Sequence, residues 1–166
     1  MKDCIHIVEF EDKYTEEVKD LLVQLQKYIA SIDKFKLNIL TDEYRDGYFA
    51  NTLSEVYSNK GKIFVALYEG NVVGMVAGYM VSYTLEDKLD YVCPPKGMIS
   101  ELIVDQNLRG GGVGKLLMAQ MEQYLKSLGC EYIKLQVFAY NDGAKRFYDN
   151  MGYEPVLIDM LKKVEE

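Results

Sequence analysis

The segment from Arg109 to Gly114 has three glycines directly after an arginine and a fourth after one valine, in the order Arg-Gly-Gly-Gly-Val-Gly. An apolar run from Met98 to Val104 precedes it, and apolar residues at helical spacing follow it. A strand, a glycine-rich turn and a helix in this order direct several backbone N–H groups, together with the positive end of the helix, at one place. The chemistry expected there is the binding of an anion, and above all of a phosphate group.

Two common phosphate-binding motifs do not fit these residues. A P-loop requires Ser or Thr after Gly-Lys, but Gly114-Lys115 is followed by Leu116. The dinucleotide-binding motif requires a third glycine, and its two possible frames have Lys115 or Leu117 at that position. The phosphate compound must therefore be bound in another way.

The pattern that does fit is Arg-x-x-Gly-x-Gly, formed by Arg109, Gly112 and Gly114. About thirty residues later, the segment 141–153 carries the pattern Asn-x-x-Ala-x-x-Phe-Tyr followed by Gly-Tyr. Its residues are Asn141, Ala144, Phe147, Tyr148, Gly152 and Tyr153. Two motifs in this order and at this separation resemble the GNAT superfamily of acyl-CoA-dependent N-acetyltransferases, and the resemblance covers residues 60–160.

The resemblance implies that acetyl-CoA is the acyl donor, with its pyrophosphate in the glycine turn and its pantetheine arm along the preceding strand. The residues implied to contact it are Leu102, Ile103, Val104, Arg109, Gly110, Gly111, Gly112, Val113, Gly114, Lys115, Asn141 and Lys145. Arg109 would act through its guanidinium or only through its backbone. Asn141 would cap a helix, contact CoA, or do both. Lys145 would meet a phosphate or remain in solvent.

Two side chains are candidates for proton transfer. Tyr148 stands where the family has the tyrosine that protonates the departing thiolate, although packing beside Phe147 is the alternative. Glu101 lies within an apolar strand, where a carboxylate is uncommon unless it is paired or has a functional role. It is expected to be a base, a water anchor or an amine contact, unless it merely pairs with a cation or faces solvent. No cysteine falls in either motif, which favours direct attack by the amine over a covalent enzyme intermediate.

The acceptor is expected to be an amine bound by the first two helices and the loop of the 80s. Tyrosines and acids in these segments would suit a cation, although tyrosines at helical spacing also pack in cores. They are Tyr28, Tyr44, Tyr48, Tyr79, Tyr83 and Tyr91 with Glu43, Asp46, Glu86, Asp87 and Asp90. The rival functions are a non-catalytic acyl-CoA-binding or sensor module and an acetyltransferase for protein N-termini or lysines.

Length and composition set broader limits. The 166 residues suit one domain, 1–166, and 49% hydrophobic with 27% charged residues is typical of a globular protein. The net charge of −7 disfavours nucleic-acid binding, and no apolar run is long enough to span a membrane. Cys4, Cys93 and Cys130 lack metal-ligand spacing, so we expect no metal and reduced thiols in the cytoplasm. The family resemblance adds a homodimer as a possibility.

The periodicity of the chain predicts an α/β fold with a single mixed β-sheet and helices on both faces, in the order β-αα-ββ-β-α-β-α-β. This is also the order of the GNAT fold. Strands are predicted at Ile5 to Phe10, Ile63 to Tyr68, Val72 to Val81, Met98 to Val104, Tyr132 to Phe138 and Pro155 to Lys162. Helices are predicted after an N-cap at Thr15, at about 41–58, 112–128 and 143–150, and residues 84–97 are expected to form a loop.

Overall fold

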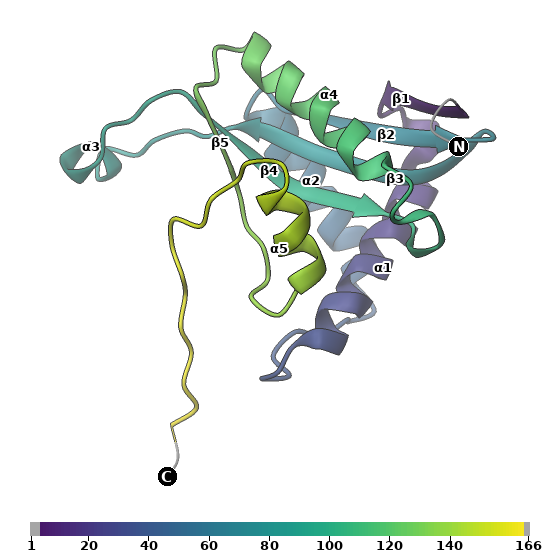
Figure 1. Ribbon diagram of the computed structural model, residues 1–166, viewed down its shortest axis with the longest axis horizontal. Coiled ribbons are helices and arrows are strands. Elements are labelled where there is room, and N and C mark those ends of the chain that lie inside the picture. Colours follow the sequence, from purple (N-terminus) through teal and green to yellow (C-terminus); the bar gives the residue numbers. More distant parts are fainter. Residues whose placement is uncertain (1–3, 165–166) are drawn as a thin grey trace. The chain divides into compact units, whose positions relative to one another are not determined.

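The computed structural model of the protein describes residues 4–164 (Figure 1). The chain divides into two compact units, of which the first ends at Gln136 and the second begins at Val137. The single domain over residues 1–166 stays a prediction, and each unit is described by itself below.

The first unit contains most of the secondary structure. Its strands are β1 (Ile5–Glu9), β2 (Lys62–Tyr68), β3 (Asn71–Met80), β4 (Lys96–Val104) and β5 (Tyr132–Leu135). Its helices are α1 (Thr15–Ile32), α2 (Tyr44–Ser58), α3 (Asp87–Asp90) and α4 (Val113–Ser127), with short 3-10 turns at Asp12–Tyr14 and Gln106–Leu108. The second unit contains α5 (Asp142–Asp149).

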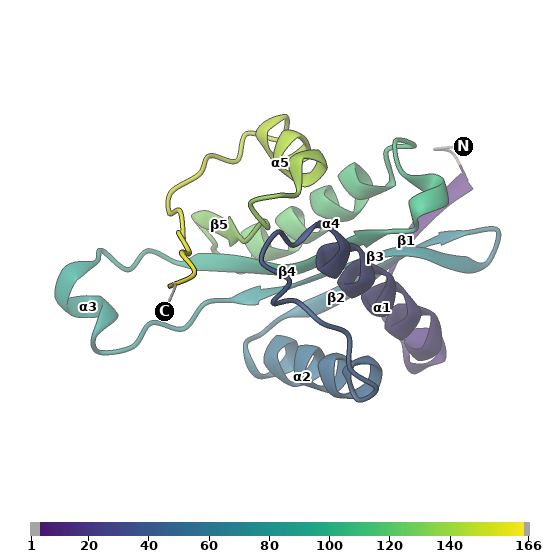
Figure 2. The same cartoon turned by 90° about the horizontal axis from the view of Figure 1, so that it is seen from below.

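The five strands form one sheet in the order β1-β2-β3-β4-β5. The first four pair antiparallel, whereas β5 pairs parallel with β4, so the sheet is mixed as predicted. Helices α1 and α2 cover one face and α4 covers the other (Figure 2). The predicted fold class is therefore confirmed.

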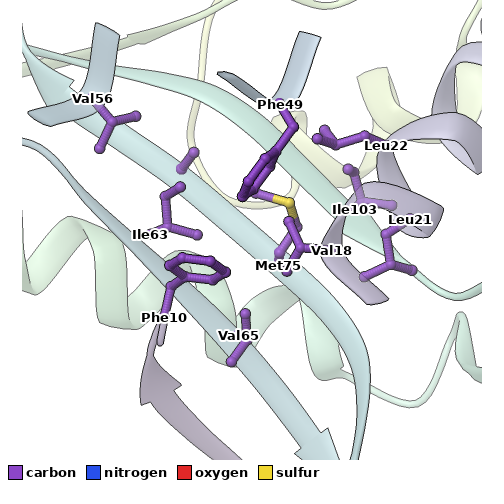
Figure 3. Packing of buried hydrophobic residues seen from close by; sticks show 11 residues of the cluster. Phe10, Val18, Leu21, Leu22, Phe49, Val56, Ile63, Val65, Met75 and Ile103 are labelled. Carbon is purple, nitrogen blue, oxygen red and sulfur yellow. The ribbon is translucent and has the colours of Figure 1, made fainter. Parts of the chain in front are cut away.

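The hydrophobic core of the first unit lies between the sheet and the pair α1 and α2 (Figure 3). Apolar side chains at helical spacing on the two helices meet side chains that alternate along β2 and β3. These residues are Val18, Leu21, Leu22, Phe49 and Val56 from the helices and Ile63, Val65, Met75 and Ala77 from the strands. This packing sets the position of α2 over the middle of the sheet.

Two glycines of β3 allow close approaches of β4 and α4, as their place inside a strand predicts. A Cβ at Gly74 would lie 2.8 Å from the Ile103 carbonyl oxygen, and one at Gly78 would lie 2.8 Å from the Met121 sulfur of α4. The pairing of β3 with β4 also shifts register between Ala77 and Gly78. This irregularity gives β4 one extra residue, Ser100, between the partners of Ala77 and Gly78.

A buried carboxylate fixes the connection that leads to α2. Asp33 is 2% exposed, and it accepts hydrogen bonds from the backbone of Phe35, Leu37 and Asn38 and from the Asn38 side-chain amide. These donors lower the pKa of Asp33 to about 2, and the largest contribution comes from the Asn38 side-chain amide. The carboxylate therefore stays ionised over the physiological range of pH. The turn that follows α1 is thereby held in one conformation.

Several boundaries differ from the sequence prediction, and among the strands the largest difference is that β5 ends at Leu135 and not at Phe138. Thr15 is not an N-cap, because the preceding 3-10 turn continues into α1 and Thr15 already has helical angles, with φ −55°. Helix α2 begins at Tyr44 rather than near residue 41. The loop 84–97 contains the one-turn helix α3, whose start is supported by hydrogen bonds between Thr84 and the Asp87 carboxylate.

The strand predicted from Pro155 to Lys162 is wrong. Residues 153–164 have no regular secondary structure, and Val156 and Met160 are 88% and 93% exposed. The segment has the β-branched and apolar residues of a strand, but a strand also needs a neighbour that completes its backbone hydrogen bonds. No described segment pairs with it.

Cys4, Cys93 and Cys130 are free thiols. Within residues 4–164, no helix combines the length and the apolar character needed to cross a lipid bilayer.

Candidate active site

The glycine turn joins the end of β4 to α4. Gly110 and Gly112 have φ of +80° and +88°, values that side chains rarely adopt, which explains why glycines stand there. Gly112 is the N-cap of α4, and no side chain of the described residues caps this helix end. The N–H groups of the first turn and the positive end of the helix dipole are therefore available to an anion, as the sequence predicted.

Arg109 holds the turn to its surroundings. Its Nε donates a hydrogen bond of 3.2 Å to the carbonyl oxygen of Val104, and its guanidinium lies 5.4 Å from the ring centre of Tyr28 on α1. These contacts give the side chain a positioning task within the first unit. Lys115, in the first turn of α4, is exposed.

The backbone of β4 becomes free on one side just before the turn. Strand β5 pairs with β4 only as far as Ile99, which lies opposite Leu135. From Glu101 to Val104, β4 pairs with β3 on its other side, and no strand of the described chain lies along this edge. Successive residues of a strand direct their N–H and C=O groups to opposite edges, and the Ile103 carbonyl oxygen lies toward Gly74 of β3, so Leu102 and Val104 face the edge without a partner strand. The Val104 carbonyl oxygen already accepts a hydrogen bond from Arg109, and the other groups of these two residues could meet an extended ligand as a neighbouring strand would.

Glu101 lies at the start of this free segment, immediately after the extra residue Ser100. Its side chain points to the face of the sheet that α2 covers, and it is only 7% exposed. The hydroxyl of Tyr48 on α2 donates a hydrogen bond to its Oε1. The ring of Tyr48 stacks on that of Tyr44, with centres 4.7 Å apart, so one turn of α2 carries both rings.

Burial raises the pKa of Glu101 to about 7, the hydrogen bond from Tyr48 lowers it, and the negative charge of Glu55 raises it. The desolvation effect is the largest of the three and sets the direction. Burial of the Tyr48 hydroxyl, together with the negative charge of Glu101, raises the pKa of Tyr48, so this hydroxyl stays protonated and remains a donor. The carboxyl group of Glu101 can thus exchange a proton near neutral pH.

A pocket of about 210 Å³ opens beside Glu101. Helix α2, strands β3 and β4, and the residue after β5 supply its walls. The lining residues are Tyr48, Glu55, Tyr79, Met98, Ile99, Ser100, Glu101 and Gln136. Glu101, at the start of the free edge of β4, therefore borders this cavity as a proton acceptor.

The second unit contains the other motif. Asn141 is the N-cap of α5, and its side chain accepts a hydrogen bond of 3.1 Å from the N–H of Ala144. Tyr148 lies on α5 with its ring centre 5.3 Å from that of Phe147 and 5.8 Å from that of Tyr153. The packing and capping interpretations of these residues are thus confirmed, and their roles toward CoA and the thiolate stay predictions.

The ammonium of Lys145 is engaged inside the second unit. It donates to the carbonyl oxygen of Ala139 at 2.8 Å and pairs with the Asp142 carboxylate at 2.8 Å. A role in binding a CoA phosphate stays a prediction.

Only part of the tyrosine and acid set expected at the acceptor site lines this pocket. Tyr48 and Tyr79 do. Tyr28 instead lies under Arg109, and the hydroxyl of Tyr83 donates to the Pro94 carbonyl oxygen. Tyr91 does not line the pocket and is 67% exposed.

Glu55 is the lining acid that sequence reasoning missed. Its position carried a usable signal, because it follows Tyr48 by two helical turns and so shares one face of α2. Gln136, Met98 and Ser100 also line the pocket. They carried no comparable signal, because the end of β5 and the extra residue in β4 fix their places.

The sequence pattern of the acetyltransferase (GNAT) family matches residues 29–153, about three quarters of the chain. An aminoalkylphosphonate N-acetyltransferase of Salmonella typhimurium is 26% identical over 92% of this chain and 89% of its own length. An uncharacterized N-acetyltransferase of Methanocaldococcus jannaschii, MJ1530, is 36% identical over 54% of this chain, and the match spans 51% of that protein. Among solved structures, a tetramutant of the BH1408 protein from Bacillus halodurans has a TM-score of 0.81 at 22% identity and covers 96% of this chain and 99% of its own.

The chain belongs to the GNAT family of acetyltransferases. It is an N-acetyltransferase, and acetyl-CoA is its acyl donor. The resemblance read from the two motifs and the predicted donor are thus confirmed.

Replacing Gly112 tests the glycine turn as the pyrophosphate site. We expect Gly112→Asp to weaken CoA binding at least about tenfold, because a like charge would face the phosphates at the helix end. Isothermal titration with CoA measures this. Gly70→Asp is the matched control, since Gly70 has φ of +83° in the turn between β2 and β3 and open space around it. Equal CoA affinity in the two folded variants would place the pyrophosphate elsewhere.

Proposed function

We propose that this chain transfers the acetyl group of acetyl-CoA to a primary amine of a small cationic acceptor, by direct attack of the amine on the thioester. The supporting observation is Glu101, a carboxyl group with a pKa of about 7 on the wall of a pocket beside the free edge of β4. A base whose pKa lies near the working pH is well suited to take a proton from an ammonium group. We assign this task to Glu101, either directly or through one water molecule.

In the proposed reaction, the acceptor enters the pocket as an ammonium ion and loses one proton to the Glu101 carboxylate. The nitrogen lone pair then forms a bond to the acetyl carbon, and the bond from that carbon to sulfur breaks. The electron pair of that bond leaves with the thiolate, which takes a proton from the Tyr148 hydroxyl. The nitrogen loses its second proton as it becomes an amide, and this proton restores the Tyr148 hydroxyl through solvent, while Glu101 releases its own proton to solvent. The position of Tyr148 in the second motif supports this assignment.

The binding of the donor is proposed to rest on the backbone. The backbone groups of Leu102 and Val104 that face the free edge of β4, on either side of Ile103, would pair with the amide groups of the pantetheine arm. The turn from Gly110 to Gly114 and the uncapped end of α4 would hold the pyrophosphate. In this proposal Arg109 acts by holding the turn, since its guanidinium already contacts Tyr28 and Val104.

The size and charge of the pocket support a small cationic acceptor. Its volume of about 210 Å³ lies below the range of drug-sized ligand sites, and its described walls carry two carboxylates and no basic side chain. A non-catalytic acyl-CoA-binding module would gain nothing from a carboxylate that burial makes costly to ionise. This consideration favours an enzyme over such a module.

The pH dependence of turnover tests Glu101 as the base. Because the carboxyl must be deprotonated to accept a proton, we expect kcat/KM to rise with pH through a step at about pH 7. Glu101→Gln should remove this step and lower kcat on the order of 100-fold. Release of CoA thiol with a panel of primary amines measures both. Glu131→Gln, which removes the same charge from an exposed loop, serves as control. A retained step with unchanged kcat in Glu101→Gln would exclude Glu101 as the base.

Replacing Tyr148 tests the proposed acid separately. Tyr148→Phe keeps the ring that packs against Phe147 and Tyr153 and removes the proton donor. We expect kcat to fall on the order of 100-fold while the affinity for acetyl-CoA changes less than about threefold. The control is Tyr140→Phe, which removes a hydroxyl from another aromatic residue of the second unit. If the two variants turn over equally, Tyr148 has no part in proton transfer.

A further inference from the structure

The pocket has a second acidic wall that the proposed mechanism does not use. Glu55 lies on α2 two turns after Tyr48, and the hydroxyl of Tyr79 on β3 donates a hydrogen bond of 2.6 Å to its Oε1. Glu55 is exposed to solvent, whereas Glu101 is buried. The pocket thus has one carboxylate in its interior and another at its rim.

The Glu55 carboxylate at the rim is held in place by a hydroxyl donor and not by a cation. The pKa of Tyr79 is raised, first by burial and then by its contact with Glu55, so its hydroxyl stays protonated and donates. Within residues 4–164, no Lys or Arg forms an ion pair with Glu55 or Glu101. Each oxygen of Glu55 can accept further hydrogen bonds, because a carboxylate has about four acceptor sites and the Tyr79 hydroxyl uses one of them.

An acceptor with one amino group would leave this second carboxylate unmatched. An acceptor that carries a negative group, such as a phosphonate, would bring that group toward two carboxylates on the described walls. An acceptor with two ammonium groups would satisfy both, because one nitrogen can reach Glu101 while the other remains charged against Glu55. The arrangement of the walls therefore discriminates among amines by their second functional group.

We infer that Glu55 and Tyr79 form a second cation subsite and that the acceptor is an aliphatic diamine or a longer polyamine. This inference rests on the proposed function of the pocket. One ammonium gives its proton to Glu101 and its nitrogen receives the acetyl group. The other ammonium keeps its three N–H donors and its charge, and binds the Glu55 carboxylate, whose orientation Tyr79 fixes. Glu55 is a specificity-determining residue in this scheme, and Tyr79 is a positioning residue.

Amines of matched length test the subsite. Putrescine, butylamine and 4-aminobutyrate share a four-carbon chain and differ only in the second group, and 2-aminoethylphosphonate adds an anion of the kind named for the Salmonella relative. With the full chain and saturating acetyl-CoA, we expect kcat/KM for putrescine to exceed that for butylamine at least about tenfold. Both anionic amines should fall below butylamine. Equal values for putrescine and butylamine would overturn the inference.

Substitution of Glu55 assigns the preference to this residue. Glu55→Gln should reduce the ratio of putrescine to butylamine to near one, and Tyr79→Phe should reduce it in part. Glu131→Gln, the same charge change in a loop outside the pocket, should keep the full ratio. Glu55→Gln also removes a charge that raises the pKa of Glu101, which moves the pH profile to lower pH for every amine alike. The ratio is therefore compared at a pH above that step.

Direct binding separates this inference from the proposed function. Calorimetric titration of putrescine into protein saturated with CoA should show binding that is lost in Glu55→Gln and kept in Glu131→Gln. No binding, or equal binding in the two variants, would refute the subsite even where acetylation of amines is observed. Failure of the proposed function has a different result, which is the absence of thiol release with every amine.

Discussion

The burial of the Glu101 carboxyl is the constraint on which the rest of the site depends. A carboxylate in a mostly apolar strand is costly to ionise, and the pKa of about 7 expresses this cost. The shift from an ordinary value of 4.5 corresponds to roughly 3 kcal/mol, which folding must supply when the group is charged. Because the folded pKa is raised, this penalty is absent below about pH 4.5 and complete above about pH 7.

The architecture around Glu101 follows from keeping this group both buried and reachable. The extra residue at Ser100 changes the register of β4 just before Glu101, and β5 ends before it can cover the same edge. Helix α2 brings Tyr48 to the carboxyl as a hydrogen-bond donor, and the Asp33 turn fixes the chain on the way to that helix. Core packing, the irregular pairing of β3 with β4 and the Asp33 turn thus all help to position the elements around Glu101.

Local patterns were enough to predict the fold class and to single out the two motifs and Glu101, because each depends on residues that are neighbours in the chain. The last strand was predicted wrongly from an apolar run, since pairing depends on a partner that the run itself does not specify. Glu55 was missed for a related reason. Its helical spacing to Tyr48 is local, but its place opposite Tyr79 arises only when α2 lies on β3.

The most direct measurement is a titration of the Glu101 side-chain carboxyl by carbon-13 NMR, with its resonance assigned by its absence in Glu101→Gln. We expect a midpoint near pH 7, well above that of an ordinary glutamate. We also expect a further rise of the midpoint in Tyr48→Phe, because the hydrogen bond from Tyr48 favours the charged form. A midpoint near pH 4.5 in the wild-type protein would exclude Glu101 as the base, since it would then be an ordinary solvated carboxylate and a poor acceptor for an ammonium proton.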